Sequence, residues 1–429
     1  MTDYQSPISP GRSWYEDSCG ARPTYPALDS DISVDVAVVG GGFCGLSAAL
    51  HLAKAGTNVA VIDGQRFGDG ASGRNGGQMG SGPRGDVTEL EKQLGFERTK
   101  ALWDMTEDAK RSLLDIASDH DFDPDYQAGQ LTPMHKRRFE TEARREAELL
   151  NDRFGYEKVS YLDQQQMAQA LGSKAYFGGI RDSGTGHIHP MKYLIGLAGA
   201  AHSTGAQLYE KTEALTIDRK ATGFQIKTTS GTISADRVVL ALNGYHNDLR
   251  PELASHVLPI QSFIGATVPL GNNSPVLPGK EAVDDSRFVV RYFRKSKDNR
   301  LLFGGREAYG KSQPGDIERS IRRQITEIYP ELADTEITHA WGGNVAITMP
   351  RMPYVREFEP GLWSAGGFSG HGVMLSNYTG RMIAEHFLGH SNQINLLKEL
   401  DIPSFPGGSL FRNPLKVLAL TWYAMLDRI

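Results

Sequence analysis

Cysteine is scarce in this chain of 429 residues, which holds only Cys19 and Cys44. Two thiols cannot form a disulfide framework, and their scarcity favours a reducing compartment. Long apolar runs are also missing, because no stretch approaches the roughly eighteen residues that a membrane span requires. The first thirty residues are polar and rich in proline, without the apolar core of a signal peptide. We therefore expect a soluble, cytoplasmic protein with no transmembrane segment.

A strong charge of either sign is absent as well. The chain carries 46 Lys and Arg against 51 Asp and Glu, for a formal net charge of −5, and no basic block stands out. This balance argues against a nucleic-acid partner. The hydrophobic fraction of 39% is ordinary for a globular protein. Because the chain is long for a single core, we expect two domains.

A strand–helix–strand unit is predicted near the N-terminus. The β-branched run 34–39 is typical of a strand buried on both faces of a parallel sheet. Apolar residues then recur at helical spacing over 46–53, and a second apolar run follows at 59–62. This order indicates the opening of a Rossmann-type α/β sheet.

The turn between the first strand and the helix carries a dinucleotide-binding pattern. Gly40, Gly42 and Gly45 form G-x-G-x-x-G, in which the glycines permit a tight turn, close approach to a pyrophosphate, and close helix–strand packing. The helix N-terminus would offer N–H groups to the phosphates. Asp63 ends the second strand, where a carboxylate can accept hydrogen bonds from a ribose diol.

A second glycine-dense loop decides which dinucleotide is expected. Residues 67–82 read FGDGASGRNGGQMGSG. A nicotinamide dehydrogenase has no need of such a loop directly after the ribose-binding strand. A flavin does, because its ribityl chain and isoalloxazine ring thread between loops that supply backbone donors without side-chain bulk. The sequence therefore favours FAD.

These motifs and others form an ordered set along nearly the whole chain. The set comprises DVAVVGGGFCGLSAALHLAKAG at 35–56, GASGRNGGQ at 70–78, GHIHP at 186–190, DNRLLFGG at 298–305, MPRMPYV at 349–355, GFSGHGV at 367–373 and FPGG at 405–408. In this set the chain resembles the D-amino-acid-oxidase-like superfamily of FAD-dependent oxidoreductases, which includes glycine and sarcosine oxidases. Within the superfamily, the resemblance points to amine oxidation in polyamine catabolism, specifically putrescine degradation.

The resemblance implies a set of cofactor-binding residues for non-covalent FAD. These are Gly40, Gly42, Phe43, Cys44, Gly45, Asp63, Gly64, Ser72, Arg74, Asn75, Gly76, Gly77, Gly370, Gly372 and Val373. A helix beginning near Leu375 would aim its positive end at flavin N1 and the C2 carbonyl. Some superfamily members attach the flavin through a C-terminal cysteine or a loop histidine. This chain has no cysteine after Cys44, and Asn75 stands in the loop, so covalent attachment is not expected.

The catalytic candidates are expected to position the substrate, because a neutral amine bound near flavin N5 needs no dedicated base. They are His371, Arg351, Arg294, Tyr292 and Trp341. His371 lies beside the flavin by resemblance, or else its ring points away. Arg294 either holds a distant substrate carboxylate or is a surface arginine. The aromatic side chains of Tyr292, Trp341 and Tyr309 either face a cationic amine or belong to the core.

Two further observations bear on the substrate and on metals. Val345 stands about where related amino-acid oxidases place an arginine that holds the substrate carboxylate, although Arg351 could replace it from nearby. This favours an amine whose reactive carbon bears no carboxylate. His187 and His189 either line the cavity or are structural. No third ligand is apparent beside them, so no metal is expected.

The expected fold is α/β, with a discontinuous Rossmann-type FAD-binding domain of the glutathione-reductase type and a smaller α+β substrate domain. We assign 34–92, 155–247 and 341–429 to the FAD-binding domain, 93–154 and 248–340 to the substrate domain, and 1–33 to an N-terminal arm. The amphipathic segment 415–429 is expected to dock on the protein, although self-association and membrane contact remain open.

The expected reaction is FAD-dependent oxidation of an amine, either gamma-glutamylputrescine or a related polyamine conjugate. Hydride passes to flavin N5, the resulting imine gives an aldehyde, and dioxygen is the expected acceptor. One alternative is a flavin dehydrogenase of N-alkylated amino acids or opines that uses a quinone or another acceptor. A second is a non-catalytic flavoprotein that uses FAD as a structural or sensing element.

Overall fold

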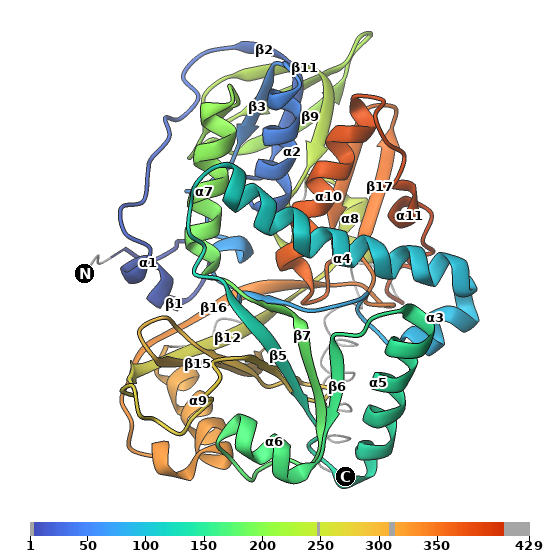
Figure 1. The fold of residues 1–429 in the computed structure, drawn as a ribbon. Coiled ribbons are helices and arrows are strands. Elements are labelled where there is room, and N and C mark those ends of the chain that lie inside the picture. The colour runs from blue at the N-terminus through green and yellow to red at the C-terminus, as the bar shows by residue number, and fades with distance from the viewer. Residues whose placement is uncertain (1–3, 247–248, 309–313, 407–429) are drawn as a thin grey trace.

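A computed structural model describes residues 4–246, 249–308 and 314–406 of the chain. Two β-sheets organise it, one above the other in Figure 1. Helix α4 (Phe96–Asp119) runs across the molecule at the level where the two parts meet. Tyr309 and the segment 415–429 lie outside the described residues. Among the described helices, none is long and apolar enough to cross a membrane.

The upper sheet has eight strands, and its core is parallel. From edge to edge the order is β17-β18-β11-β2-β3-β8, with β10 and then β9 joined to β11. The strands are β2 (Ile32–Val39), β3 (Val59–Ile62), β8 (Gln207–Tyr209), β9 (Ala214–Arg219), β10 (Phe224–Thr228), β11 (Thr232–Leu240), β17 (Tyr354–Glu359) and β18 (Leu362–Gly366). Segments from three distant parts of the chain therefore form one sheet.

The predicted strand–helix–strand unit is confirmed. β2 and β3 are parallel neighbours, with Val36 opposite Val59, and α2 (Phe43–Lys54) connects them. Alternating residues on both sides of Ser230-Gly231 predict a hairpin, and the apolar run 237–242 predicts a buried strand. The structure contains the hairpin of β10 and β11, and β11 continues to Leu240, so one strand pairs with β10 and then with β18. The late helix is also confirmed as α10 (Gly372–Phe387).

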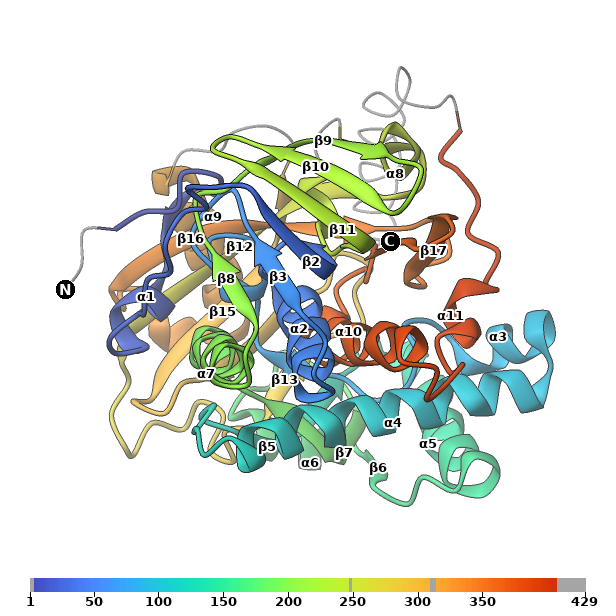
Figure 2. The same cartoon turned by 90° about the horizontal axis from the view of Figure 1, so that it is seen from above.

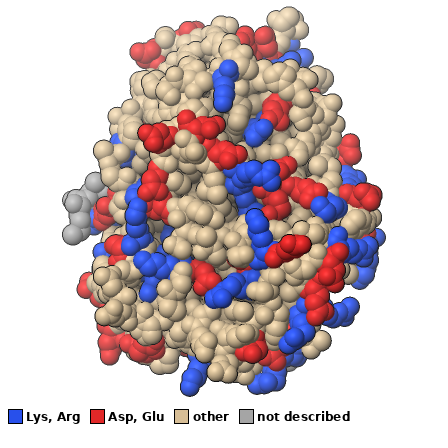
Figure 3. All heavy atoms as spheres, viewed as in Figure 1, with Lys and Arg blue, Asp and Glu red and all other residues tan. Residues whose placement is uncertain are grey.

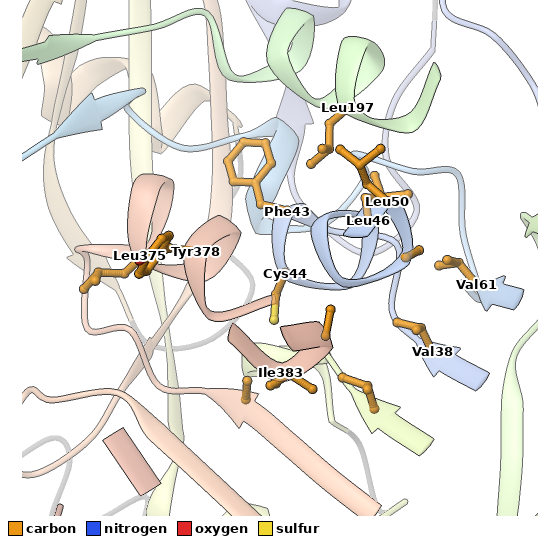
Figure 4. Packing of buried hydrophobic residues seen from close by; sticks show 14 of the residues in the cluster. Val38, Phe43, Cys44, Leu46, Leu50, Val61, Leu197, Leu375, Tyr378 and Ile383 are labelled. Atoms are coloured by element: carbon orange, nitrogen blue, oxygen red, sulfur yellow. The ribbon is translucent and has the colours of Figure 1, made fainter. Parts of the chain in front are cut away.

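Three helices cover one face of this sheet: α2, α7 (Pro190–Ser203) and α10 (Figure 2). Val38 of β2 and Val61 of β3 are fully buried beneath Leu46 and Leu50 of α2 (Figure 4). Phe43 of α2 packs edge-on against Tyr193 of α7, with ring centroids 5.4 Å apart. Apolar side chains on both faces of the parallel strands thus form the main core.

The lower sheet has ten strands and is mostly antiparallel. Its order is β1-β16-β12-β15-β14-β13-β5-β7-β4, with β6 paired to β7. The strands are β1 (Gly11–Arg12), β4 (Gln78–Met79), β5 (Gln127–Pro133), β6 (Val159–Leu162), β7 (Gly179–His187), β12 (Leu258–Pro269), β13 (Ala282–Asp284), β14 (Tyr292–Lys295), β15 (Arg300–Ala308) and β16 (Ile337–Ile347).

The remaining elements are helical. They are α1 (Trp14–Ser18), α3 (Val87–Leu94), α5 (Glu140–Phe154), α6 (Gln164–Leu171), α8 (Pro251–His256), α9 (Pro314–Ile328) and α11 (Asn395–Lys398), with short 3₁₀ turns at Ala71–Gly73, Arg137–Phe139, Asn243–Tyr245 and Pro330–Leu332. The charged, amphipathic stretch from Glu89 to Asp152 predicts helix, and it contains α3, α4 and α5 but is interrupted by β5. Alternating burial along β5 fits a strand with one covered face.

The expected division into domains remains a prediction, and strand membership departs from it in places. β7 falls in the segment 155–247 assigned to FAD binding, yet it pairs with β5 in the lower sheet. The arm is not simply extended, because its β1 pairs with β16 and its α1 contacts α7. The surface seen in Figure 3 carries acidic and basic side chains interspersed, in keeping with the small net charge.

Candidate active site

A cavity of about 630 Å³ lies where the two sheets meet, a typical size for a small-molecule site. Its lining comes from β-strand ends and loops of both parts. The upper part contributes Gly40, Gly42, Asp63, Ala241 and Gly372, the loop after β3 contributes Ser72, Arg74, Gly76 and Gly77, and the lower sheet contributes Ser262, Asp284, Tyr292 and Val345. Figure 1 shows that these segments are far apart in the chain.

At one end of the cavity is the glycine turn between β2 and α2. Gly40 has φ +111°, a conformation that a residue with a side chain rarely adopts. A Cβ at Gly45 would overlap the Gly40 carbonyl oxygen and approach Val38 within 3.0 Å. The first turn of α2 has no acidic residue and no side-chain cap. Its positive end is therefore available to an anionic group such as a pyrophosphate.

Asp63, at the end of β3, lies beside this turn. Its carboxylate accepts hydrogen bonds from the N–H groups of Gly41 (2.8 Å) and Gln65 (2.9 Å). Burial raises the pKa of Asp63 to about 6, although the two backbone N–H groups act in the opposite direction. The two bonds fix the carboxylate in the cavity wall, where the ribose of a dinucleotide was expected.

The loop 72–77 is held by its carbonyl groups. Four consecutive backbone oxygens accept hydrogen bonds from outside the loop. The donors are Trp341 Nε1 to Arg74 O (3.0 Å), the Tyr15 hydroxyl to Asn75 O (2.8 Å), Arg294 Nε to Gly76 O (2.6 Å) and Ile188 N to Gly77 O (2.8 Å). Side chains from α1, β14 and β16 thereby fix the loop along the cavity wall.

The side chains of this loop also stabilise it. Arg74 is buried, and its guanidinium donates to the carbonyl oxygens of Gly342 (2.7 Å), Pro10 (2.8 Å) and Gly11 (2.8 Å). Burial lowers the pKa of Arg74 to about 10. The Ser72 hydroxyl accepts from Phe43 N–H at 3.0 Å, which links the loop to the first turn of α2. Small, locked backbone therefore faces the cavity on this side.

A second helix N-terminus meets the cavity at α10. Gly370, Gly372 and Val373 line the cavity, and the first turn of α10 has neither an acidic residue nor a side-chain cap. His371 does not line it, because its ring packs against Gly80. Burial, reinforced by the nearby charge of Arg84, lowers the pKa of His371 to about 4. At neutral pH the positive field at this end therefore comes from the helix and not from His371.

The five catalytic candidates separate into two groups. Tyr292 and Arg351 line the cavity. The Tyr292 hydroxyl lies 3.0 Å from Ser262 Oγ, and Arg351 lies over the Phe288 ring at 4.4 Å. Arg294, Trp341 and His371 are not among the lining residues. Arg294 and Trp341 lie behind the loop 72–77, where they hydrogen-bond its carbonyl groups, so their position is structural.

The cofactor candidates are brought together with one exception. All of them line the cavity apart from Gly45, which packs α2 against the turn. His187 and His189 do not line it: His187 Nε2 lies 3.0 Å from Lys280 O, and His189 caps α7. In the described part of the chain, no group of three or more His, Cys, Asp or Glu side chains is arranged to hold a metal ion.

Sequence reasoning missed several residues at the site. Arg84 and Asp284 line the cavity as an ion pair, and Gln78 lines it while donating to Val283 O at 2.8 Å. Tyr15, from the arm, supports the loop 72–77. The only signals in the sequence were the glycine-rich surroundings of Arg84 and the position of Asp284 at a strand end. Neither signal distinguishes these residues from surface charges.

The residues present fit FAD. Two uncapped helix N-termini, a carboxylate at the end of β3 and a loop of small residues border one continuous cavity. The sequence matches the family described as FAD dependent oxidoreductase (DAO) over residues 35–386. The chain belongs to this family. Like other FAD-dependent oxidoreductases of the family, it is an enzyme whose cofactor is FAD.

Relatives and solved structures agree with this assignment. The probable oxidoreductase OrdL of Rhizobium meliloti is 56% identical over 99% of both chains. It is more similar to this chain than the gamma-glutamylputrescine oxidoreductase of Escherichia coli, which is 32% identical over the full length of both. Glycine oxidase from Geobacillus kaustophilus has the same fold, with a TM-score of 0.71 at 23% identity over 84% of this chain and 96% of that one. Several of the matched proteins are named for amine or amino-acid substrates, among them the gamma-glutamylputrescine oxidoreductase and the glycine oxidase.

Proposed function

We propose that this enzyme oxidises a primary or secondary amine within a polyamine conjugate such as gamma-glutamylputrescine, with dioxygen as electron acceptor. The observation that carries the proposal is the wall formed by β16. There Asn344, Val345 and Ala346 line the cavity, and no arginine stands at 345 to hold a carboxylate next to the reacting carbon. A wall of this kind suits an aminomethylene group better than an α-amino acid.

The loop 72–77 and the N-termini of α2 and α10 would hold FAD, which would supply two-electron oxidation. A neutral amine would lose a hydride to it, and the resulting iminium would react with water to give an aldehyde, the released amine or ammonia, and a proton. The chain's own residues provide position and environment. Tyr292 lines the cavity with its hydroxyl 3.0 Å from Ser262 Oγ, and its aromatic ring would stabilise the positive charge that develops as the amine is oxidised. The N-terminus of α10 stabilises negative charge that develops beside it.

The test is an anaerobic panel of amines mixed with the flavin-loaded enzyme. The visible absorbance of the flavin should bleach rapidly with gamma-glutamylputrescine or another acylated diamine, and slowly or not at all with glycine, sarcosine or proline. The opposite order, with α-amino acids reacting and acylated diamines inert, would contradict the proposal. A flavin that no member of the panel bleaches would likewise contradict the proposal, because the substrate would then lie outside the amines and amino acids tested.

The position of Arg351 favours a second candidate function. Its guanidinium lines the cavity on the Phe288 ring and could hold the carboxylate of an N-alkylated amino acid or opine. A dehydrogenase of this kind would pass its electrons to a quinone. Stoichiometric hydrogen peroxide release during turnover supports the oxidase. Turnover that requires an added quinone, without peroxide, supports the dehydrogenase.

A further inference from the structure

Two opposite charges face the cavity from the lower part of the molecule. Arg84 Nη1 lies 3.5 Å from Asp284 Oδ2, and both residues line the cavity. About a quarter of each side chain is accessible, 24% for Arg84 and 25% for Asp284. Since both line the cavity, this accessible surface is open to a ligand.

Asp284 is held in place from three sides. It ends β13, where it lies opposite Tyr292 of β14, and the preceding Val283 O accepts a hydrogen bond from Gln78. The next residue, Asp285, is buried and accepts from the Tyr176 hydroxyl at 2.9 Å and from Arg291 N–H at 3.0 Å. Together with the hydrogen bond from Asp285 N–H to Arg291 O (3.1 Å), these bonds hold the residues on both sides of Asp284.

The ion pair with Asp284 leaves the Arg84 guanidinium able to bind a further anionic group. A guanidinium has five N–H donors and can bind a carboxylate through two of them. In the described part of the chain, the one ion-pair partner of Arg84 is Asp284, at a distance longer than a good charge-assisted hydrogen bond. Burial raises the pKa of Asp284, and the charge of Arg84 opposes this rise. An ammonium group of a ligand beside Asp284 would favour the charged carboxylate in the same way.

Arg294 was the sequence-based candidate for holding a distant carboxylate, and its position argues against that role. Its guanidinium is buried behind the loop 72–77 and donates to Gly76 O and to the Tyr15 hydroxyl. Arg84 is an arginine whose guanidinium is open to the cavity with a carboxylate beside it. A neighbouring pair, Arg181 and Glu281, is closer at 2.8 Å, but neither residue lines the cavity.

We propose that Arg84 and Asp284 bind the non-reacting end of a zwitterionic substrate, with Arg84 holding a carboxylate and Asp284 an ammonium. The proposal rests on the amine oxidation proposed above. Oxidation requires a neutral amine, whereas a carboxylate partner favours the protonated form. The nitrogen bound by Asp284 is therefore not the one oxidised. The substrate class is a diamine joined to a group that carries both charges, as in an α-amino-acid head group.

Four amines that share a four-carbon acyl chain, and differ only in the groups on its last carbon, test the charges separately. Putrescine acylated with a gamma-glutamyl group carries both charges, a glutaryl group carries only the carboxylate, a 4-aminobutanoyl group only the ammonium, and a butanoyl group neither. Anaerobic flavin reduction gives, for each amine, the concentration for half-maximal rate and the limiting rate. With the unaltered enzyme, the concentration for half-maximal rate should be at least about tenfold lower for the gamma-glutamyl compound than for the butanoyl compound.

Single substitutions should act only on the amine that carries the matching charge. Arg84→Gln should raise the amine concentration for half-maximal flavin reduction about tenfold, but only for the two compounds that carry a carboxylate, gamma-glutamyl and glutaryl. Asp284→Asn should raise it about tenfold only for the two that carry the ammonium group, gamma-glutamyl and 4-aminobutanoyl. The limiting rates should stay within about twofold, because the lost contact is uniform binding. Arg84→Lys should restore part of the carboxylate preference. Glu281→Gln is the matched control and should change none of these values.

The opposite results are equally clear. If the variants weaken the binding of all four amines alike, or of none, the role of the ion pair is purely structural and the proposal is overturned. The comparison in the unaltered enzyme remains decisive even if a variant loses its flavin, because equal half-maximal concentrations for the gamma-glutamyl and butanoyl compounds overturn it directly. If none of the four reduces the flavin, the proposed amine oxidation itself fails, and this inference fails with it.

Discussion

Arg294 and Trp341 act through backbone groups of the loop that borders the cavity. Arg294 donates to Gly76 O and Trp341 to Arg74 O, while Tyr15 donates to the intervening Asn75 O. Each donor is buried, so each bond is formed away from water and its loss leaves a carbonyl oxygen without its partner. The residue types suggested substrate binding, but the positions show that these side chains hold the loop 72–77.

We expect Arg294→Met to weaken FAD binding at least about tenfold, because the buried Gly76 and Tyr15 oxygens lose a charged donor. Titrating flavin-free protein with FAD measures the dissociation constant. Arg300→Met is the matched control: Arg300 is on the neighbouring strand and pairs with Asp298 outside the cavity, so its loss should leave FAD binding unchanged. Unaltered affinity in Arg294→Met would show that the loop does not need this donor.

Two helices, α2 and α10, begin at the cavity with similar first turns. Each starts beside glycine, and each lacks both an acidic first turn and a side-chain cap. In isolation such helix starts are poor, since the N-cap residue offers no side-chain acceptor to the first N–H groups. In α2 the Phe43 N–H instead donates to Ser72 Oγ of the loop 72–77. At a cavity that holds an anionic dinucleotide, the same absence is useful, because it leaves the positive ends free for the ligand.

The packing of α2 gives a prediction for two glycines in helices. Gly45→Ala should abolish or greatly weaken FAD binding, because the added Cβ would overlap the Gly40 backbone. Gly199→Ala in α7 is the same change at a site with nothing within 4 Å of the added Cβ. There it should raise the free energy of unfolding by up to about 1 kcal/mol and leave FAD binding intact. The flavin content of the purified variants measures FAD binding, and thermal unfolding measures stability. A normal flavin content in Gly45→Ala would refute the close packing.

At the scale of the whole molecule, burial of histidine in different parts of the fold couples stability to pH. Burial lowers the pKa of His187, next to Lys280, to about 3 and that of His51, on α2, to about 4. In the unfolded chain both would titrate near 6.5. Below that pH the unfolded chain binds more protons than the folded one, so these residues make the free energy of unfolding fall as the pH falls. Asp63, whose pKa is raised to about 6, acts in the opposite direction.

We expect His187→Gln to reduce the loss of stability between pH 7 and pH 5 by roughly 2 kcal/mol, the linkage contribution of a histidine that stays neutral in the folded state. Denaturant unfolding at pH 7 and at pH 5 gives the change in the free energy of unfolding between them. Any destabilisation by the substitution that is the same at both pH values cancels in this change. His390→Gln, at an exposed position, is the control and should leave the pH dependence unchanged. An identical pH dependence in His187→Gln and the unaltered protein would refute the prediction.

The sequence determined the local units of this protein. β2, the glycine turn, α2, β3 and Asp63 follow one another within about thirty residues, so hydrophobic periodicity and glycine spacing specify them directly. The same logic predicted the hairpin of β10 and β11 and the helix α10. The family and its cofactor follow from these units, because each motif carries its own physical requirement.

Only the tertiary structure decided which side chains face the cavity. Arg84 and Asp284 are 200 residues apart, and Arg294 is 218 residues from the Gly76 carbonyl that it binds. Such pairs form only after the two sheets have packed together, and nothing in the neighbouring sequence distinguishes an arginine that lines the cavity from one that lies behind its wall. Local preferences fix the backbone of each unit, whereas the exposure of each charge depends on the packing of distant strands.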